Sequence, residues 1–185
     1  MITAGVDLGV RKAAVSILCE EELVTTKAYE SSATLRSTQL AEVSSWVQAL
    51  INLYQADAVY VEEPIAGRSV RVSLQIAQMA GAVLAALDDL HNRDGVLTRS
   101  YLVSNTHWKK ALLGLGAGKD IKLKVRKWLD TEFPSYASKC DGDQDRYDAS
   151  CIAIYGERQQ LLAARLREGT DVLGAAALPD GQALA

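Results

Sequence analysis

The chain has 185 residues, of which 49% are hydrophobic and 23% charged, as expected of a single globular domain with a full core. Its net charge of −3 excludes binding to nucleic acid by bulk charge alone. We expect no membrane partner, because no apolar stretch approaches the roughly 18 residues that span a bilayer. The N-terminus has no basic residues ahead of its apolar ones, which favours a cytoplasmic protein over a secreted one. Three cysteines without a C-x-x-C pair indicate free thiols: Cys19, Cys140 and Cys151.

The N-terminal half of the chain begins with three short β-prone runs separated by turns, which predict an antiparallel meander. An amphipathic helix follows, and then a fourth strand that ends at Pro64, because proline cannot donate to a sheet ladder. In chain order we expect strands at 3–10, 12–19 and 22–29, a helix over 37–54, a strand at 56–64 and a helix over 73–91. One apolar face of the second helix carries Leu74, Ala77, Gly81, Leu84 and Leu87.

The C-terminal half adds one strand and three helices. We expect them at 95–104, 106–114, 119–132 and 143–167, with a glycine-rich loop after the second. The apolar stripe of the helix over 119–132 consists of Ile121, Val125, Trp128 and Leu129, so its lysines must face elsewhere. Small residues dominate 168–185, which predicts a flexible tail. This order of elements describes an α/β fold, with a five-stranded mixed sheet and helices on both faces.

A basic segment lies between Asn105 and Trp128. It has seven basic residues and a single acid, which gives a local net charge of +6 in an acidic chain. Such a segment can hold phosphate groups, and a solvated helix face explains the same charges. Both interpretations stay open at this point. The basic residues are Lys109, Lys110, Lys119, Lys122, Lys124, Arg126 and Lys127.

Carboxylates stand at three places where charge is costly. Asp7 is the one charge inside an apolar strand, and Glu62 with Glu63 ends another. Asp145 and Asp148 are three residues apart, so both project from one face of the last helix, which then enters the core. A helix N-terminus offsets such repulsion by only about 0.3–1 kcal/mol per group. A bound divalent cation supplies enough positive charge to offset the repulsion between these carboxylates. Oxygen ligands without His or Cys select Mg²⁺ or Mn²⁺ over zinc.

Two other interpretations apply to the aspartates before the last helix. A calcium loop of the EF-hand type that began at Asp141 would have Arg146 in place of the required glycine and Ile152 in place of the required glutamate, so it is excluded. Capping of the helix N-terminus explains Asp141 and Asp143. It does not explain Asp148, which lies further inside the helix.

Five motifs occur in order over about residues 2–160: "GVDLGV", "VYVEEP", "SLQIAQMAGAVLAAL", "WKKALLGLGAGK" and "DRYDASCIAIYG". Together they resemble the RuvC family of Holliday junction resolvases, in the ribonuclease H-like nuclease superfamily. Each motif is weak by itself, since a D-x-G strand also opens sugar kinases and actin-like ATPases. The resemblance implies a ribonuclease H-like nuclease domain over 1–167. It also implies an endonuclease that resolves four-way DNA junctions by paired symmetric nicks.

The resemblance also implies the cofactor and its ligands. Two Mg²⁺ ions, which Mn²⁺ can replace, would assist hydrolysis and leave 5′-phosphate and 3′-hydroxyl ends. Glu62 is preferred to Glu63 because it follows the apolar strand directly, as in the family. The expected ligands, called here the carboxylate cluster, are Asp7, Glu62, Asp145 and Asp148.

Contacts with branched DNA and with a second copy are further implications. The family has an aromatic wedge after its catalytic glutamate, whereas "PIAGRSVRV" has none, and two arginines are the available substitutes. Paired nicks imply a homodimer, and the small-residue-rich helix over 73–91 is the candidate interface, with core packing as the alternative. The residues expected to contact DNA are Lys109, Lys110, Lys119, Lys122, Arg68 and Arg71.

Two rival functions stay open. One is a ribonuclease H-fold nuclease that acts on structured RNA, of the kind that processes pre-ribosomal RNA. The other is a junction-binding protein without catalytic activity, although intact ligands at all four positions argue against it. An actin-like ATPase is disfavoured because the later glycine-rich nucleotide segments are not evident.

Overall fold

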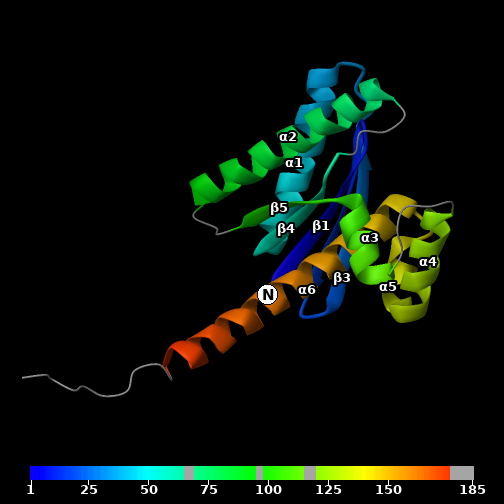
Figure 1. Ribbon diagram of the computed structural model, residues 1–185. Helices are drawn as coiled ribbons and strands as arrows, with labels where there is room; N and C mark the ends of the chain where they lie inside the picture. Colours follow the sequence, from blue (N-terminus) through cyan, green and yellow to red (C-terminus); the bar gives the residue numbers. More distant parts are fainter. Residues whose placement is uncertain (65–68, 95–97, 115–119, 176–185) are drawn as a thin grey trace, which may run out of the picture.

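The computed structural model describes residues 1–64, 69–94, 98–114 and 120–175. Within these residues, the chain forms one five-stranded sheet with helices on both faces (Figure 1), which confirms the predicted fold class. The strands are β1 (Ile2–Leu8), β2 (Lys12–Cys19), β3 (Glu22–Glu30), β4 (Ala58–Glu62) and β5 (Arg99–Val103). The helices are α1 (Arg36–Tyr54), α2 (Val70–Asp94), α3 (Asn105–Leu113), α4 (Ile121–Glu132), α5 (Pro134–Cys140) and α6 (Gln144–Ala175).

The sheet has the strand order β3-β2-β1-β4-β5. The first three strands pair antiparallel, as the meander predicted. Strand β4 runs parallel to β1, and β5 runs parallel to β4. The sheet is therefore mixed, and β1 and β4 end side by side at the same edge.

Alternation along β1 assigns its residues to the two faces of the sheet. Ala4 and Val6 are fully buried in the core that α1 and α2 cover. Gly5 faces α6, where a Cβ at this position would lie 2.2 Å from the carbonyl oxygen of Ala149. Such a distance is impossible for a real side chain, so glycine lets α6 pack directly on β1. Asp7 lies two residues further along the strand and therefore shares the α6 face.

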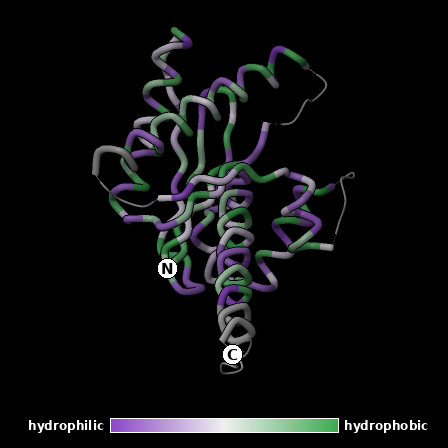
Figure 2. The backbone as a smooth tube through the Cα atoms, turned by 60° about the vertical axis from the view of Figure 1, so that its left-hand side comes forward, coloured by the Kyte–Doolittle hydropathy of each residue, from purple (hydrophilic) through white to green (hydrophobic). Residues whose placement is uncertain are grey.

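The C-terminal region differs from its prediction in two ways. Helix α5 was not expected, although Pro134 stands at its start, where proline is favoured. Helix α6 continues to Ala175, beyond the expected end at Arg167, and projects away from the rest of the fold (Figure 2). Residues 176–185 of the expected tail lie outside the described residues, as does the glycine-rich loop at 115–119.

Helix α2 also departs from expectation. Among the described residues, its segment Val70–Leu90 is long and apolar enough to cross a membrane by length and composition alone, so the expectation of no such stretch is wrong. In the fold, Met79, Val83 and Leu87 enter the core with α1. Of the predicted apolar face, Leu87 is therefore buried and Leu84 is half-buried. Its remaining members are exposed: Leu74, Ala77 and Gly81. The exposed stripe of α2 consists of Val70, Leu74, Ala77, Gly81 and Ala85.

Candidate active site

Asp7 and Glu62 meet at the carboxyl ends of two parallel strands. The register pairs Val6 of β1 with Val61 of β4, so the next residue of each strand lies at the same level. The charge of Glu62 is, after burial, the largest cause of the raised pKa of Asp7, as expected of neighbouring carboxyl groups. Glu63 is exposed, and its backbone N–H donates to the carbonyl oxygen of Val103 in β5 at 2.8 Å. Strand alternation thus places Glu62, and not Glu63, beside Asp7.

Helix α6 brings Asp145 and Asp148 to the same place. Asp148 is only 9% exposed, and Asp145 retains a quarter of its side-chain exposure. The pKa of Asp7 is raised well above its usual range, first by burial and then by the charges of Glu62, Asp148 and Asp145. The charges of the other three acids therefore all act on Asp7, although the four residues come from three separate elements.

Asp148 is held between opposing influences. Burial raises its pKa to about 6, and the charge of Glu62 acts in the same direction. The charge of Lys109 opposes this rise, as does a hydrogen bond at 2.9 Å from the Gln144 side-chain amide. A buried acid with a perturbed pKa in a cluster of acids is typical of a functional site.

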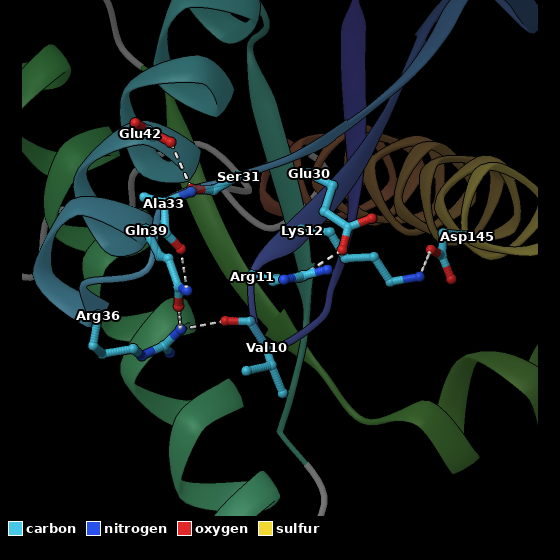
Figure 3. A network of polar contacts seen from close by, with 10 residues as sticks. All are labelled: Val10, Arg11, Lys12, Glu30, Ser31, Ala33, Arg36, Gln39, Glu42 and Asp145. Carbon is cyan, nitrogen blue, oxygen red and sulfur yellow. Dashed lines mark hydrogen bonds and ion pairs between the residues drawn. The ribbon is translucent and has the colours of Figure 1, made fainter.

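The carboxylate cluster is not a ready-made metal cage. Within the described residues, no three His, Cys, Asp or Glu side chains are placed to hold a metal ion as they stand. Asp145 instead forms an ion pair with Lys12 (Figure 3), and Glu62 accepts hydrogen bonds from Asn105 and Trp108. The donor set still fits Mg²⁺ or Mn²⁺, because it consists of oxygen ligands whose mutual repulsion a divalent cation relieves.

Helix α3 supports Glu62 through side chains that the sequence did not single out. The Trp108 indole N–H donates to Glu62 at 3.0 Å, and the Asn105 amide donates to the same oxygen. Lys109 is 7% exposed; its ammonium donates to Asn105 at 2.9 Å and lies 4.7 Å from the centre of the Trp108 ring. Lys109, one of the residues expected to contact DNA, is buried here, and its positive charge opposes the rise in the pKa of Asp148.

Helix α4 supports Asp148 through Gln144. The Arg126 guanidinium donates to the Gln144 carbonyl oxygen at 2.8 Å and to the Gly142 carbonyl at 2.6 Å. Because the Gln144 oxygen is engaged in this way, its NH₂ group faces Asp148. The contact between Gln144 and Asp148 is local, since the two residues are four apart on α6, whereas the Arg126 contacts join separate helices and could not be predicted from a local pattern.

The two remaining aspartates have local roles. Asp143 accepts a hydrogen bond at 2.9 Å from the backbone N–H of Asp145, which confirms its predicted role as the cap of α6. Asp141 is exposed and ends α5 in the left-handed region, with φ 52°. The cap prediction for Asp141 is therefore wrong, because a second helix ends where only the start of α6 was expected.

The expected DNA-binding residues are distributed unevenly. Lys110 on α3 and Lys122 on α4 are exposed, as is Arg71 near the start of α2. Lys124 and Lys127 are also exposed on α4. Arg68 and Lys119 lie outside the described residues. The exposed lysines share the side of the sheet that carries the carboxylate cluster, because α3 and α4 pack there with α6.

Comparison with known proteins gives the relationship of the chain. The family model described as "Crossover junction endodeoxyribonuclease RuvC" matches residues 3–138, a range that contains Asp7 and Glu62 and ends before Asp145. No curated protein matches the chain.

Solved structures share the fold. RuvC from Thermus thermophilus is 22% identical, with a TM-score of 0.61 over 86% of this chain and 97% of that one. The yeast mitochondrial Holliday junction resolvase is 13% identical, with a TM-score of 0.61 over 92% of this chain and 85% of that one. The fowlpox virus resolvase, solved with substrate Holliday junction DNA, is 12% identical, with a TM-score of 0.55 over 89% of this chain and 99% of that one. Since the family model covers more than half of its length, the chain belongs to the RuvC family of crossover junction endodeoxyribonucleases.

Proposed function

We propose that this junction-resolving endonuclease cuts four-way DNA by paired symmetric nicks at the carboxylate cluster. The observation that carries the proposal is the convergence of acids from β1, β4 and α6, where the strand register sets Asp7 level with Glu62 and Asp148 is buried. Burial, and then the charges of the other three acids, raise the pKa of Asp7 there. Such an arrangement costs stability in a protein that does not use it, because like charges in a buried place repel one another. In a phosphodiesterase that works with divalent cations, the bound cations would relieve this repulsion, which explains why the acids are kept together.

The carboxylate cluster would hold two Mg²⁺ ions, or Mn²⁺ in their place. When bound, such ions supply an activated water and stabilise the charge that develops on the phosphodiester. The chain itself positions the ligands: Asn105 and Trp108 orient Glu62, and Gln144 orients Asp148. Lys109 contributes a buried positive charge that helps an anionic substrate approach.

The exposed lysines of α3 and α4 would hold the DNA backbone on either side of the scissile phosphate. Lys110 and Lys122 are the described candidates, and Lys119 belongs to the same proposal. Arg71, together with Arg68, would stand in for the missing aromatic wedge. Binding that depends on such lysines falls steeply as the salt concentration rises.

The exposed stripe of α2 would form the homodimer interface. It combines large apolar residues such as Val70 and Leu74, which are 74% and 60% exposed, with small ones that let a second helix approach closely. Two active sites related by a twofold axis would make the two symmetric nicks. The cytoplasm of a bacterium, or of a phage-infected cell, is the location that we propose for this activity.

The test is a nicking assay on a mobile four-way DNA junction and on a structured RNA, with Mg²⁺ or Mn²⁺. We expect the wild-type protein to nick the junction, and Asp7→Asn to bind it without cutting. Asp141→Asn is the matched control, because Asp141 is exposed and outside the carboxylate cluster. Cleavage of RNA alone would favour the RNA nuclease. Junction binding by an inactive wild-type protein would favour the binding module, and wild-type rates for Asp7→Asn would refute the site.

A further inference from the structure

Lys12 makes a contact at the site that the proposed chemistry does not use. It is the first residue of β2, and its ammonium forms an ion pair with Asp145 at the start of α6 (Figure 3). The side chain reaches Asp145 by lying across Gly9, where a Cβ would come within 2.7 Å of the Lys12 Cγ. Because glycine has no Cβ, position 9 leaves room for the Lys12 side chain to extend toward Asp145.

The surroundings of Lys12 are acidic. Besides Asp145, the charges of Asp7 and Asp143 act on its ammonium. The pair is accessible, since the side chains of Lys12 and Asp145 are 46% and 24% exposed. An open cavity of ≈ 320 Å³ adjoins it, lined by residues that include Lys12, Asp143 and Arg146. Water and small ions can thus reach the pair without any change of the fold.

We propose that Lys12 is the counter-cation of Asp145 in the metal-free protein, and that its ammonium competes with a divalent ion for this carboxylate. The inference rests on the proposed metal site at the carboxylate cluster. An ammonium group and a metal ion that bind the same carboxylate repel each other, so each lowers the affinity of the other. Lys12 consequently competes with metal and raises the metal concentration that the enzyme needs.

Arg11 provides a matched control. It neighbours Lys12 and carries the same charge, but its guanidinium pairs with Glu30 at 2.6 Å. Both members of that pair are more than half exposed and lie outside the carboxylate cluster (Figure 3). Replacing Arg11 removes one positive charge from the same turn and leaves the contact with Asp145 in place.

The experiment measures Mn²⁺ binding to the DNA-free, full-length protein through the paramagnetic resonance signal of the free ion. Lys12→Met should bind Mn²⁺ about fivefold more tightly than wild type, which is the upper range for a partly exposed ion pair. Lys12→Arg, which keeps the charge, should stay near wild type, and Arg11→Met should change the affinity by less than about twofold. Thermal unfolding of each variant checks that the fold persists.

Two results would overturn the inference and leave the proposed metal site standing. The first is Mn²⁺ affinity that is unchanged or weaker in Lys12→Met, while Asp7→Asn abolishes binding. The second is an equal gain in Lys12→Met and Arg11→Met, which would show that net charge acts without the contact. If the wild type and all variants fail to bind Mn²⁺, the metal site itself is wrong, and the inference falls with it.

Discussion

Replacing Asp148 with asparagine should stabilise the metal-free protein at neutral pH while it abolishes cleavage. Asp148 is 9% exposed, and burial raises its pKa to about 6 from an ordinary 3.8. Asparagine keeps the size of the side chain and an oxygen that accepts the hydrogen bond from Gln144. It carries no charge, so the folded protein no longer has to ionise a group in a poorly solvated, acidic place.

The magnitude follows from the pKa difference between the folded and unfolded chain. A difference of about two pKa units corresponds to about 3 kcal/mol. Well below pH 4 the carboxyl group is protonated in both states, and at pH 4 only the unfolded chain has begun to release the proton, so the cost is still small. As the pH rises from about 4 to about 6, the unfolded chain releases this proton first, and the folded state loses stability. Above about pH 6 the loss is complete, and Asp148→Asn should recover it.

The assay is urea unfolding in EDTA at pH 4 and pH 8. Asp148→Asn should exceed the wild-type free energy of unfolding by about 3 kcal/mol at pH 8 and by far less at pH 4. Asp141→Asn is the control, because Asp141 is exposed and has a left-handed backbone that asparagine tolerates. Added Mg²⁺ should narrow the difference at pH 8, since metal binding stabilises the wild type. An equal gain at both pH values, or no gain at pH 8, would refute the reasoning.

Three other variants test the packing, the ligand support and the interface. Gly5→Ala should lower the free energy of unfolding by about 1–3 kcal/mol, since the new Cβ would meet a carbonyl oxygen of α6 at 2.2 Å; wild-type stability in urea would contradict this packing. Gln144→Ala should weaken Mn²⁺ binding about tenfold, and Gln160→Ala further along α6, which loses only a hydrogen bond to Tyr60 of β4, should not; equal effects would argue against ligand support. Leu74→Glu should yield monomers in analytical ultracentrifugation, whereas Leu53→Glu on α1 should not; unchanged sedimentation of both would exclude the α2 interface.

Regular elements were predictable because their patterns are local. The helical spacing of α1 reflects one buried face and one wetter face, and the run of β-prone residues in β1 reflects a strand that is buried on both faces; a sequence records both patterns directly. Helix α5 was not predicted, because seven residues are too few to show a helical period of apolar residues. The core face of α2 could not be chosen from the pattern, since the helix is apolar on the core side and on the exposed stripe alike.

The members of the carboxylate cluster were visible in the sequence by themselves, because a charge in an apolar strand or on the inner face of a helix is costly and stands out. Their approach depends on the register of β1 with β4 and on the tight packing of α6 over Gly5. The partners from distant segments, Lys12 for Asp145 and Asn105 for Glu62, carry no local signal in the sequence. Only the tertiary structure selected them, since a hydrogen bond or ion pair between distant segments exists once the chain has folded and leaves no periodic trace in the sequence.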